Sequence, residues 1–116
     1  HRVIAKRSVD SIVNERHLLS ILKNPFLVNM VYAFQDKTTL YLVMNIKEGG
    51  DLRYHLAKKH KFNELETRFM VGTIILGLEY LHKKMIIHRD VKPENIVFDD
   101  LGYASLTDLG IAKYLR

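Results

Sequence analysis

The chain has 116 residues, of which 47% are apolar and 27% charged, and its formal net charge is +5. This length is enough for one small domain with a real core, and the composition is that of an ordinary globular protein. The chain contains no cysteine, which excludes a disulfide framework and a thiolate zinc site. No apolar run approaches the roughly 18 residues of a membrane-spanning helix. Because the chain opens with His1 and not with Met, we expect it to be a piece of a longer protein.

The first part of the chain predicts a helix followed by a β-hairpin. Residues 8–23 place leucine and isoleucine side chains near one helical stripe, and Pro25 marks the end of the helix. Residues 28–34 and 40–46 predict two strands. The short polar segment 35–39 between them predicts that the two strands pair as a hairpin.

The second part of the chain is expected to be richer in helices. Residues 47–50 are the one plausible boundary, because they separate the strand-rich part from the helix-rich part. A short helix is expected over 51–58. Asn63 followed three residues later by Glu66 predicts a capping box, and the helix that it begins runs to about Lys84. The apolar face of this helix is broad, so we expect it to be largely buried.

A second hairpin is expected near the C-terminal end of the chain. Residues 96–98 predict a short strand, 99–102 a turn, and 104–107 the returning strand. This arrangement would place Asn95 and Asp108 at the two open ends of the hairpin and bring them together in space.

The most specific pattern in the sequence is the run His-Arg-Asp-Val-Lys-Pro-Glu-Asn from His88 to Asn95. Asp108-Leu109-Gly110 follows thirteen residues after Asn95. Taken one at a time, each residue has a plainer interpretation, such as a surface ion pair for Asp90 or a turn for Asn95. Taken together, they resemble the catalytic loop and the metal-binding segment of eukaryotic protein kinases.

This resemblance implies a chemistry that suits the residue types. Phosphoryl transfer needs positioning and neutralisation of charge more than covalent help from the protein. Asp90 is expected to accept the proton of the attacking hydroxyl group, and Lys92 to meet the charge of the transferred phosphoryl group. Asn95 and Asp108 are expected to hold Mg²⁺, which prefers oxygen ligands. The implied cofactors are therefore ATP and Mg²⁺.

The resemblance extends over nearly the whole chain. The segments Asn24-Pro25-Phe26-Leu27-Val28, Leu40-Tyr41-Leu42-Val43-Met44 and Gly49-Gly50-Asp51-Leu52 resemble AGC-type serine/threonine kinases. The fold class implied is α+β, an incomplete protein-kinase-like fold. Residues 1–47 would be part of the small lobe, with a helix, two strands and the hinge. Residues 48–116 would be the start of the helical large lobe, to just past Asp-Leu-Gly.

The resemblance also implies nucleotide contacts. Met44 matches the residue behind the adenine pocket, residues 45–47 match the hinge, and Asp51 matches the acidic residue that reaches the ribose and, in basophilic kinases, a substrate arginine. Val97 would lie under the adenine ring. The whole expected set is Met44, Asn45, Ile46, Lys47, Asp51, Glu94, Val97 and Asp108.

Further positions are expected to have structural or regulatory roles. Glu15 matches the ion-pairing glutamate of the small-lobe helix, although an exposed helical charge is the plainer interpretation. Arg89 matches the arginine that pairs with a phosphorylated activation loop, and a guanidinium group suits that role. The residues that match the buried stack between the lobes are Leu19, Met30, His88 and Leu109.

The function implied is transfer of the ATP γ-phosphoryl group to serine or threonine hydroxyl groups of proteins, because tyrosine kinases usually lack a lysine at the position of Lys92. An acceptor with basic residues nearby and an intracellular location, in the cytoplasm or the nucleus, are expected. The glycine-rich loop, the strand lysine and the activation segment are not found, and Leu109 replaces the usual phenylalanine. We therefore expect the isolated chain to transfer phosphate negligibly and to expose apolar surface on the helix of residues 63–84.

Two alternatives remain open. The chain could belong to a non-catalytic truncated kinase or pseudokinase that binds partners, although the intact set of Asp90, Lys92, Asn95 and Asp108 argues against it. It could instead be a small basic nucleic-acid binder. The basic run 58–61 favours solvated helix ends over such a surface, because no aromatic residues interleave with the charges. His55 is expected at the surface, and no nucleic-acid partner and no membrane span are expected.

Overall fold

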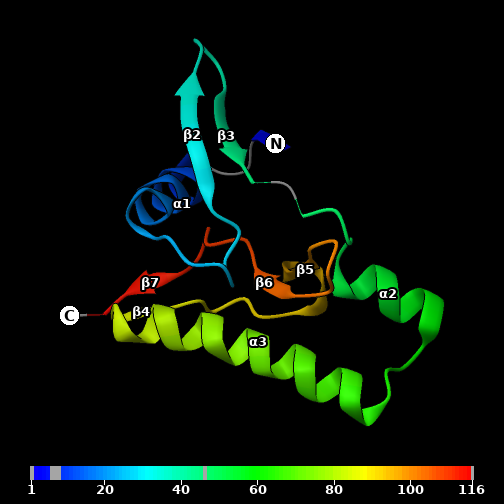
Figure 1. The fold of residues 1–116 in the computed structure, drawn as a ribbon. Helices are drawn as coiled ribbons and strands as arrows, with labels where there is room; N and C mark the ends of the chain where they lie inside the picture. Colours follow the sequence, from blue (N-terminus) through cyan, green and yellow to red (C-terminus); the bar gives the residue numbers. More distant parts are fainter. Residues whose placement is uncertain (1, 6–8, 46, 116) are drawn as a thin grey trace.

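The computed structural model describes residues 2–5, 9–45 and 47–115. Its elements in chain order are β1 (Arg2–Ala5), α1 (Val9–Ile21), β2 (Met30–Gln35), β3 (Leu40–Met44), α2 (Leu52–Lys59), α3 (Glu64–Lys83), β4 (Ile86–Ile87), a short 3-10 helix η1 (Pro93–Asn95), β5 (Ile96–Phe98), β6 (Ala104–Leu106) and β7 (Lys113–Tyr114). The α+β class with small antiparallel sheets is confirmed, and Figure 1 shows the strand-rich part above the long helix α3.

The first sheet has the strand order β1-β3-β2 and is antiparallel throughout. The predicted hairpin of β2 and β3 is confirmed. Asp36 closes its turn, because its Oδ1 atom accepts hydrogen bonds from the backbone N–H groups of Thr38 and Thr39 at 2.9 and 2.8 Å. The pairing of β1 with β3 was not predicted from the sequence. Helix α1 lies beside this sheet in Figure 1.

Both helices of the second part begin at side-chain caps. The Oδ1 atom of Asp51 accepts the N–H of Tyr54 at 2.7 Å and so begins α2. At α3, Asn63 accepts the N–H of Glu66, and Glu66 accepts the N–H of Asn63 in return. The predicted capping box is therefore confirmed, and it satisfies N–H groups that a helix start otherwise leaves without partners.

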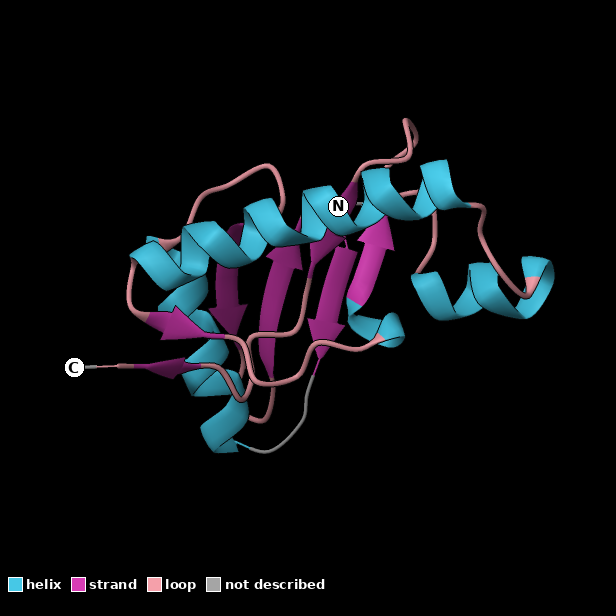
Figure 2. Ribbon diagram, turned by 90° about the horizontal axis from the view of Figure 1, so that it is seen from below, coloured by secondary structure: helices cyan, strands magenta, loops and turns pink. Residues whose placement is uncertain are grey.

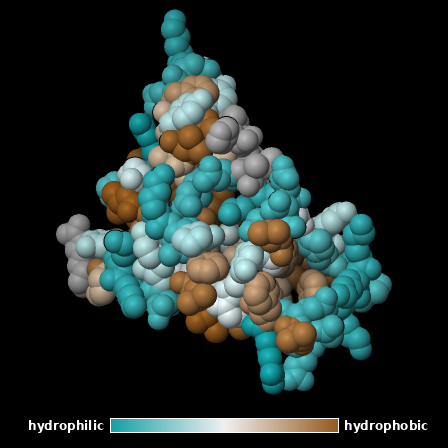
Figure 3. Space-filling view, in the orientation of Figure 1, coloured by the Kyte–Doolittle hydropathy of each residue, from teal (hydrophilic) through white to brown (hydrophobic). Residues whose placement is uncertain are grey.

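The expectation that α3 is largely buried is wrong for this chain. Only Thr73, Gly77 and Leu81 of this helix are buried. Large apolar side chains of α3 lie exposed, namely Leu65, Phe69, Val71, Ile75 and Leu76. The expected exposure of apolar surface on α3 is thereby confirmed, and Figure 3 shows apolar atoms gathered on the lower part of the molecule, where Figure 1 places α3.

The second predicted hairpin, β5 and β6, is also confirmed, with Ile96 opposite Leu106. A third segment joins it, because Val28 donates its N–H to the carbonyl of Leu106 at 2.9 Å, and Leu106 donates its own to Phe26 at 2.9 Å. Below this contact, α3 approaches so closely that a Cβ atom at Gly77 would lie 2.9 Å from the carbonyl oxygen of Phe26. Glycine is therefore required where α3 crosses this segment.

A further short sheet joins β4 to β7, with Ile86 opposite Tyr114. Figure 2, seen from below, shows this pair near the C-terminal end of the described chain. One core cluster connects all these parts. It includes Leu19 of α1, Leu42 of β3, Leu81 of α3 and Leu106 of β6, each at most 3% exposed. The core thus fixes the two hairpins and the two long helices relative to one another.

Candidate active site

The loop between β4 and η1 is organised by His88, which is only 2% exposed. The Nδ1 atom of His88 accepts the backbone N–H of Asp90 at 3.1 Å, so the ring proton lies on Nε2. That Nε2 atom donates to the carbonyl of Thr107 at 2.8 Å. One neutral histidine therefore joins the loop that carries Asp90 to the residue before Asp108.

Asp90 and Asn95 are held together by the amide group of Asn95. Its Nδ2 atom donates to the backbone carbonyl of Asp90 at 2.9 Å and to Oδ2 of Asp90 at 3.0 Å. The other carboxylate oxygen, Oδ1, lies 3.5 Å from Nζ of Lys92. The side chain of Asp90 is 26% exposed, so its carboxylate is fixed by both neighbours and still reaches solvent.

The β5–β6 hairpin brings Asp108 next to this group. The ladder continues past Ile96 and Leu106, because Thr107 donates its N–H to the carbonyl of Asn95 at 3.0 Å. Asp108 follows at once with a φ of +66°, and its Oδ1 atom accepts the N–H of Gly110 at 3.2 Å. A positive φ is costly for aspartate and is typical of turns and functional sites.

The oxygen atoms of this group suit a divalent cation. Both hydrogen bonds of the Asn95 side chain use Nδ2, and within the described part of the chain none reaches its Oδ1 atom. Asp108 supplies a carboxylate from the facing strand end. Mg²⁺ is typically bound by one or two carboxylates together with substrate phosphates. Within residues 2–5, 9–45 and 47–115, the structure shows no group of three or more His, Asp or Glu side chains placed to hold a metal ion.

Glu15 of α1 is buried at 1% exposure, so the interpretation as an exposed helical charge is wrong. Its Oε2 atom accepts the N–H of Leu109 at 3.2 Å. Helix α1 therefore contacts the backbone directly after Asp108.

The expected nucleotide contacts lie where the two parts of the chain meet. Met44 is buried at 1% exposure and Val97 at 8%. Asn45 is exposed and donates its N–H to the carbonyl of Asn29 at 2.9 Å. Lys47 is half-buried, and Ile46 lies outside the described residues.

Two of the expected nucleotide contacts have other partners here. Asp51 uses Oδ1 to cap α2, and its backbone bridges that of Val97. Glu94 forms an ion pair with Arg53 at 3.1 Å, with both side chains well exposed. The cap uses one of the two carboxylate oxygens of Asp51, and the Arg53–Glu94 pair was not predicted from the sequence.

Three of the four residues expected to form a buried stack belong to one core cluster or contact it. Leu19 and Leu109 belong to the cluster, and Met30 packs against it. His88 is buried as well. Arg89, with a φ of +70°, donates from Nε to the carbonyl of Ile111 at 2.7 Å. It therefore contacts the segment after Asp108, a contact that the sequence did not predict.

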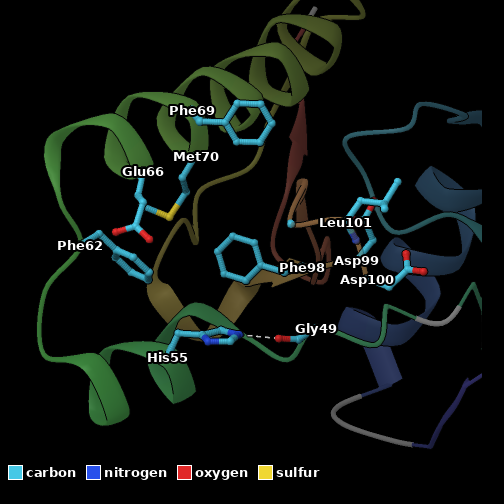
Figure 4. Close-up of a pocket in the computed structure, with 11 residues that line it drawn as sticks. Gly49, His55, Phe62, Glu66, Phe69, Met70, Phe98, Asp99, Asp100 and Leu101 are labelled. Carbon is cyan, nitrogen blue, oxygen red and sulfur yellow. Dashed lines mark hydrogen bonds between the residues drawn. The ribbon is translucent and has the colours of Figure 1, made fainter.

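A separate cavity of about 460 Å³ lies between α2, α3 and the turn after β5, as Figure 4 shows. None of the candidate catalytic residues lines it. His55 lines this cavity, where its Nε2 atom bonds to the carbonyl of Gly49 and its ring meets Phe98 edge-on at 5.4 Å. The expectation that His55 is a plain surface residue is therefore wrong, because this ring is half-buried between two elements.

Comparison with known proteins agrees with this geometry. The family described as the protein kinase domain matches residues 1–116. The chain belongs to the protein kinase family. It is 48% identical over 113 residues to a "Probable serine/threonine-protein kinase" of Dictyostelium discoideum, covering 97% of this chain and 25% of that protein.

Two other similar relatives are named kinases as well. The chain is 41% identical over 115 residues to cAMP-dependent protein kinase type 3 of Saccharomyces cerevisiae, covering 99% of this chain and 29% of that protein. It is 41% identical over 113 residues to serine/threonine-protein kinase 32C of Mus musculus, covering 97% and 23%. The resemblance to AGC-type kinases is thus confirmed, and the chain spans about a quarter of the length of these relatives.

Within residues 2–5, 9–45 and 47–115, no helix is both long enough and apolar enough to cross a bilayer.

Proposed function

We propose that the protein containing this chain is a serine/threonine protein kinase, which transfers the γ-phosphoryl group of ATP to serine or threonine hydroxyl groups of proteins. The observation that carries this proposal is the double hydrogen bond of Asn95 to Asp90, at 2.9 and 3.0 Å. It fixes a candidate proton acceptor and at the same time turns the amide oxygen of Asn95 away from it. The family membership of the chain supports the same proposal.

In this reaction the oxygen of the acceptor hydroxyl group attacks the γ-phosphorus atom. A new P–O bond forms, the bond to the β-phosphate oxygen breaks, and ADP leaves with that electron pair. Asp90 accepts the hydroxyl proton. Its carboxylate suits this role because Asn95 fixes one oxygen, while the other lies 3.5 Å from Lys92.

Lys92 is proposed to meet the negative charge that spreads over the transferred group. Its side chain is 49% exposed, so it reaches the solvent side of Asp90. Mg²⁺, when bound, would neutralise phosphate charge, and Oδ1 of Asn95 together with the carboxylate of Asp108 would hold it. Preorganised charges of this kind supply most of the catalysis in phosphoryl transfer.

The remaining contacts are finer proposals. Residues 1–47 are proposed to form part of a small lobe and 48–116 the start of a large lobe, with adenine between them near Met44, Val97 and residues 45–47. Asp51 and Glu94 are proposed to lie toward the ribose and toward basic residues of the acceptor protein. Arg89 is proposed to bind a phosphate through its terminal nitrogen atoms, because its Nε atom is used by Ile111.

A second candidate is a non-catalytic interaction module, and the exposed apolar face of α3 favours it. Leu65 of that face is 76% exposed and Ile75 is 56% exposed. The chain of 116 residues alone is proposed to bind ATP weakly and to transfer phosphate negligibly, because the glycine-rich loop that would cover the triphosphate is not found in it. The hydrogen bonds that fix Asp90 favour an enzymatic function over an interaction module for the complete protein.

The test is a comparison of Asp90→Asn with the wild type in the full-length protein, using Mg-ATP and a serine peptide that carries arginine. Loss of a general base typically lowers turnover by about 10²–10⁴-fold, and we expect a loss of this size without loss of folding. Asp100→Asn is the matched control, because Asp100 is an exposed turn residue. Equal turnover of the two variants, or wild-type protein that binds Mg-ATP and transfers nothing, would favour the interaction module.

A further inference from the structure

Helix α1 reaches the segment after Asp108 through a side chain that the reaction above does not use. The Nδ2 atom of Asn14 lies 3.0 Å from the carbonyl oxygen of Ala112, 3.1 Å from that of Gly110 and 3.4 Å from that of Leu109. Carbonyl oxygens only accept hydrogen bonds, so all three contacts need N–H donors. The amide has two N–H groups. The longest contact, with the carbonyl of Leu109, therefore shares an N–H group with one of the other two.

Asn14 works beside Glu15, the next residue of the helix. Glu15 accepts the N–H of Leu109 at 3.2 Å, while Asn14 donates toward the carbonyl of the same residue. The two side chains thus hold both backbone polar groups of the residue that follows Asp108. Leu109 is only 2% exposed and its bond to Glu15 is buried, so that bond is costly to break, while the contact with Asn14 is partly buried.

The catalytic loop holds the same segment from another side. Arg89 donates from Nε to the carbonyl of Ile111 at 2.7 Å. Each carbonyl from Leu109 to Ala112 therefore meets a side-chain donor. In Figure 1 this red-orange segment passes close to α1 between β6 and β7.

These contacts with residues 109–112 also affect Asp108, because the backbone of Asp108 is strained. A φ of +66° at an aspartate persists only where the surroundings hold it. The residues that follow it are held by α1 and by the catalytic loop, so a shift of α1 would pass directly to residue 108.

We propose that Asn14 is a positioning residue for Asp108: its amide fixes the turn of residues 109–112 and thereby the place of the Asp108 carboxylate. This inference rests on the function proposed above. This positioning role requires N–H donors in the side chain at position 14. Aspartate has the same shape as asparagine but presents only acceptors to the carbonyl oxygens.

The test compares full-length Asn14→Asp with full-length Asn63→Asp. The control makes the same chemical change with the same added charge, and aspartate caps a helix as well as asparagine does. For Asn14→Asp we expect hydrogen exchange in residues 109–112 to accelerate about tenfold, since this segment opens more often once its carbonyl groups lose the Asn14 donors. We also expect turnover to fall about tenfold or more and the Mg²⁺ concentration for half-maximal rate to rise severalfold. The control should match the wild type in all three.

Two results would overturn the proposal. One is exchange in residues 109–112 that stays at the wild-type rate. The other is a loss of activity that follows a lowered Tm with an unchanged Mg²⁺ requirement, because that pattern is expected of general destabilisation. If Asn14→Asp does not fold, Asn14→Ala removes the donors without adding charge and carries the same expectations. The exchange measurement needs no turnover, so it decides the role of Asn14 even if the wild type transfers no phosphate.

Discussion

At the scale of single residues, the side-chain amide of Asn95 does two things that no other residue type would do at once. Its nitrogen holds Asp90 by two hydrogen bonds, and this orientation turns its oxygen away from Asp90. An aspartate at position 95 would lose both donors and place a second carboxylate beside Asp90. Like charges at such a distance oppose ionisation, so the amide keeps Asp90 available as a base.

Gly49 allows a prediction of stability at this scale. A Cβ atom there would lie 2.6 Å from the carbonyl oxygen of Asp99 and 2.8 Å from that of Phe98. Gly49 also donates its N–H to Phe98 at 2.7 Å, so the backbone cannot move away without losing this bond. We expect Gly49→Ala to lower the free energy of unfolding of the full-length protein by about 1–3 kcal/mol.

The matched control for that variant is Glu48→Ala at the neighbouring exposed position, which should change stability by less than about 0.5 kcal/mol. Chemical denaturation of both variants provides the measurement. Equal stabilities of the two would mean that the close approach at Gly49 does not exist in solution.

The sequence predicted the identity of the central site residues better than their partners. Asp90, Asn95 and Asp108 stand at fixed spacings in a specific motif, and the hairpin that joins them has local turn signals. Asn14 carried no such signal, because its acceptors are backbone carbonyls about 95 residues away. The same holds for Arg53, whose ion pair with Glu94 depends on how α2 packs on η1.

At the scale of elements, the start of α3 shows how local signals fix structure. Glu66 closes the capping box and also pairs with Lys59 of α2. These contacts, first of all the hydrogen bond from Lys59 and then the backbone N–H of Asn63, hold the pKa of Glu66 below its ordinary value. A carboxyl group with a lowered pKa stabilises the folded form above that ordinary value, and the effect is lost as pH falls through the lowered pKa.

Glu66→Gln tests this effect, because glutamine keeps the capping box and removes only the charge. We expect faster hydrogen exchange at the start of α3 in the variant than in the wild type at pH 7. The difference should shrink as the pH is lowered through the lowered pKa of Glu66, because the carboxyl group of the folded wild type is then protonated and uncharged like glutamine. A difference that stays the same over this range would contradict the charge-based account.

Other features of the elements were beyond the reach of the sequence. Strands β1 and β7 are short, and each exists through pairing with a distant strand, β3 and β4 respectively. Local propensity carries little information in such cases. The burial of α3 was wrongly predicted because an apolar face shows which side of a helix avoids water, but not which element covers it.

At the scale of the whole molecule, one core joins a strand-rich part to a helix-rich part and leaves the apolar face of α3 exposed. Exposed patches of this kind favour association. We expect the chain of 116 residues to self-associate in a concentration-dependent manner. Ile75→Lys combined with Leu65→Lys should raise the concentration at which association begins severalfold, because both are exposed apolar residues of α3.

Val13→Lys is the control for that experiment, since Val13 is 56% exposed on α1, far along the chain from α3. It adds a lysine without touching the α3 face and should leave the onset of association unchanged. Sedimentation velocity over a concentration series provides the measurement. If Val13→Lys raises the onset of association as the double variant does, added charge and not the exposed apolar side chains of α3 controls association.

The central claim is that Asp90, Lys92, Asn95 and Asp108 form one phosphoryl-transfer site. Its most direct test is the turnover of the full-length protein with Asp108→Asn, measured over a range of Mg²⁺ concentrations beside Asp100→Asn. The account predicts a loss of about a hundredfold or more and a higher Mg²⁺ requirement for Asp108→Asn, and wild-type behaviour for Asp100→Asn. Equal turnover and equal Mg²⁺ dependence of the two variants would contradict it.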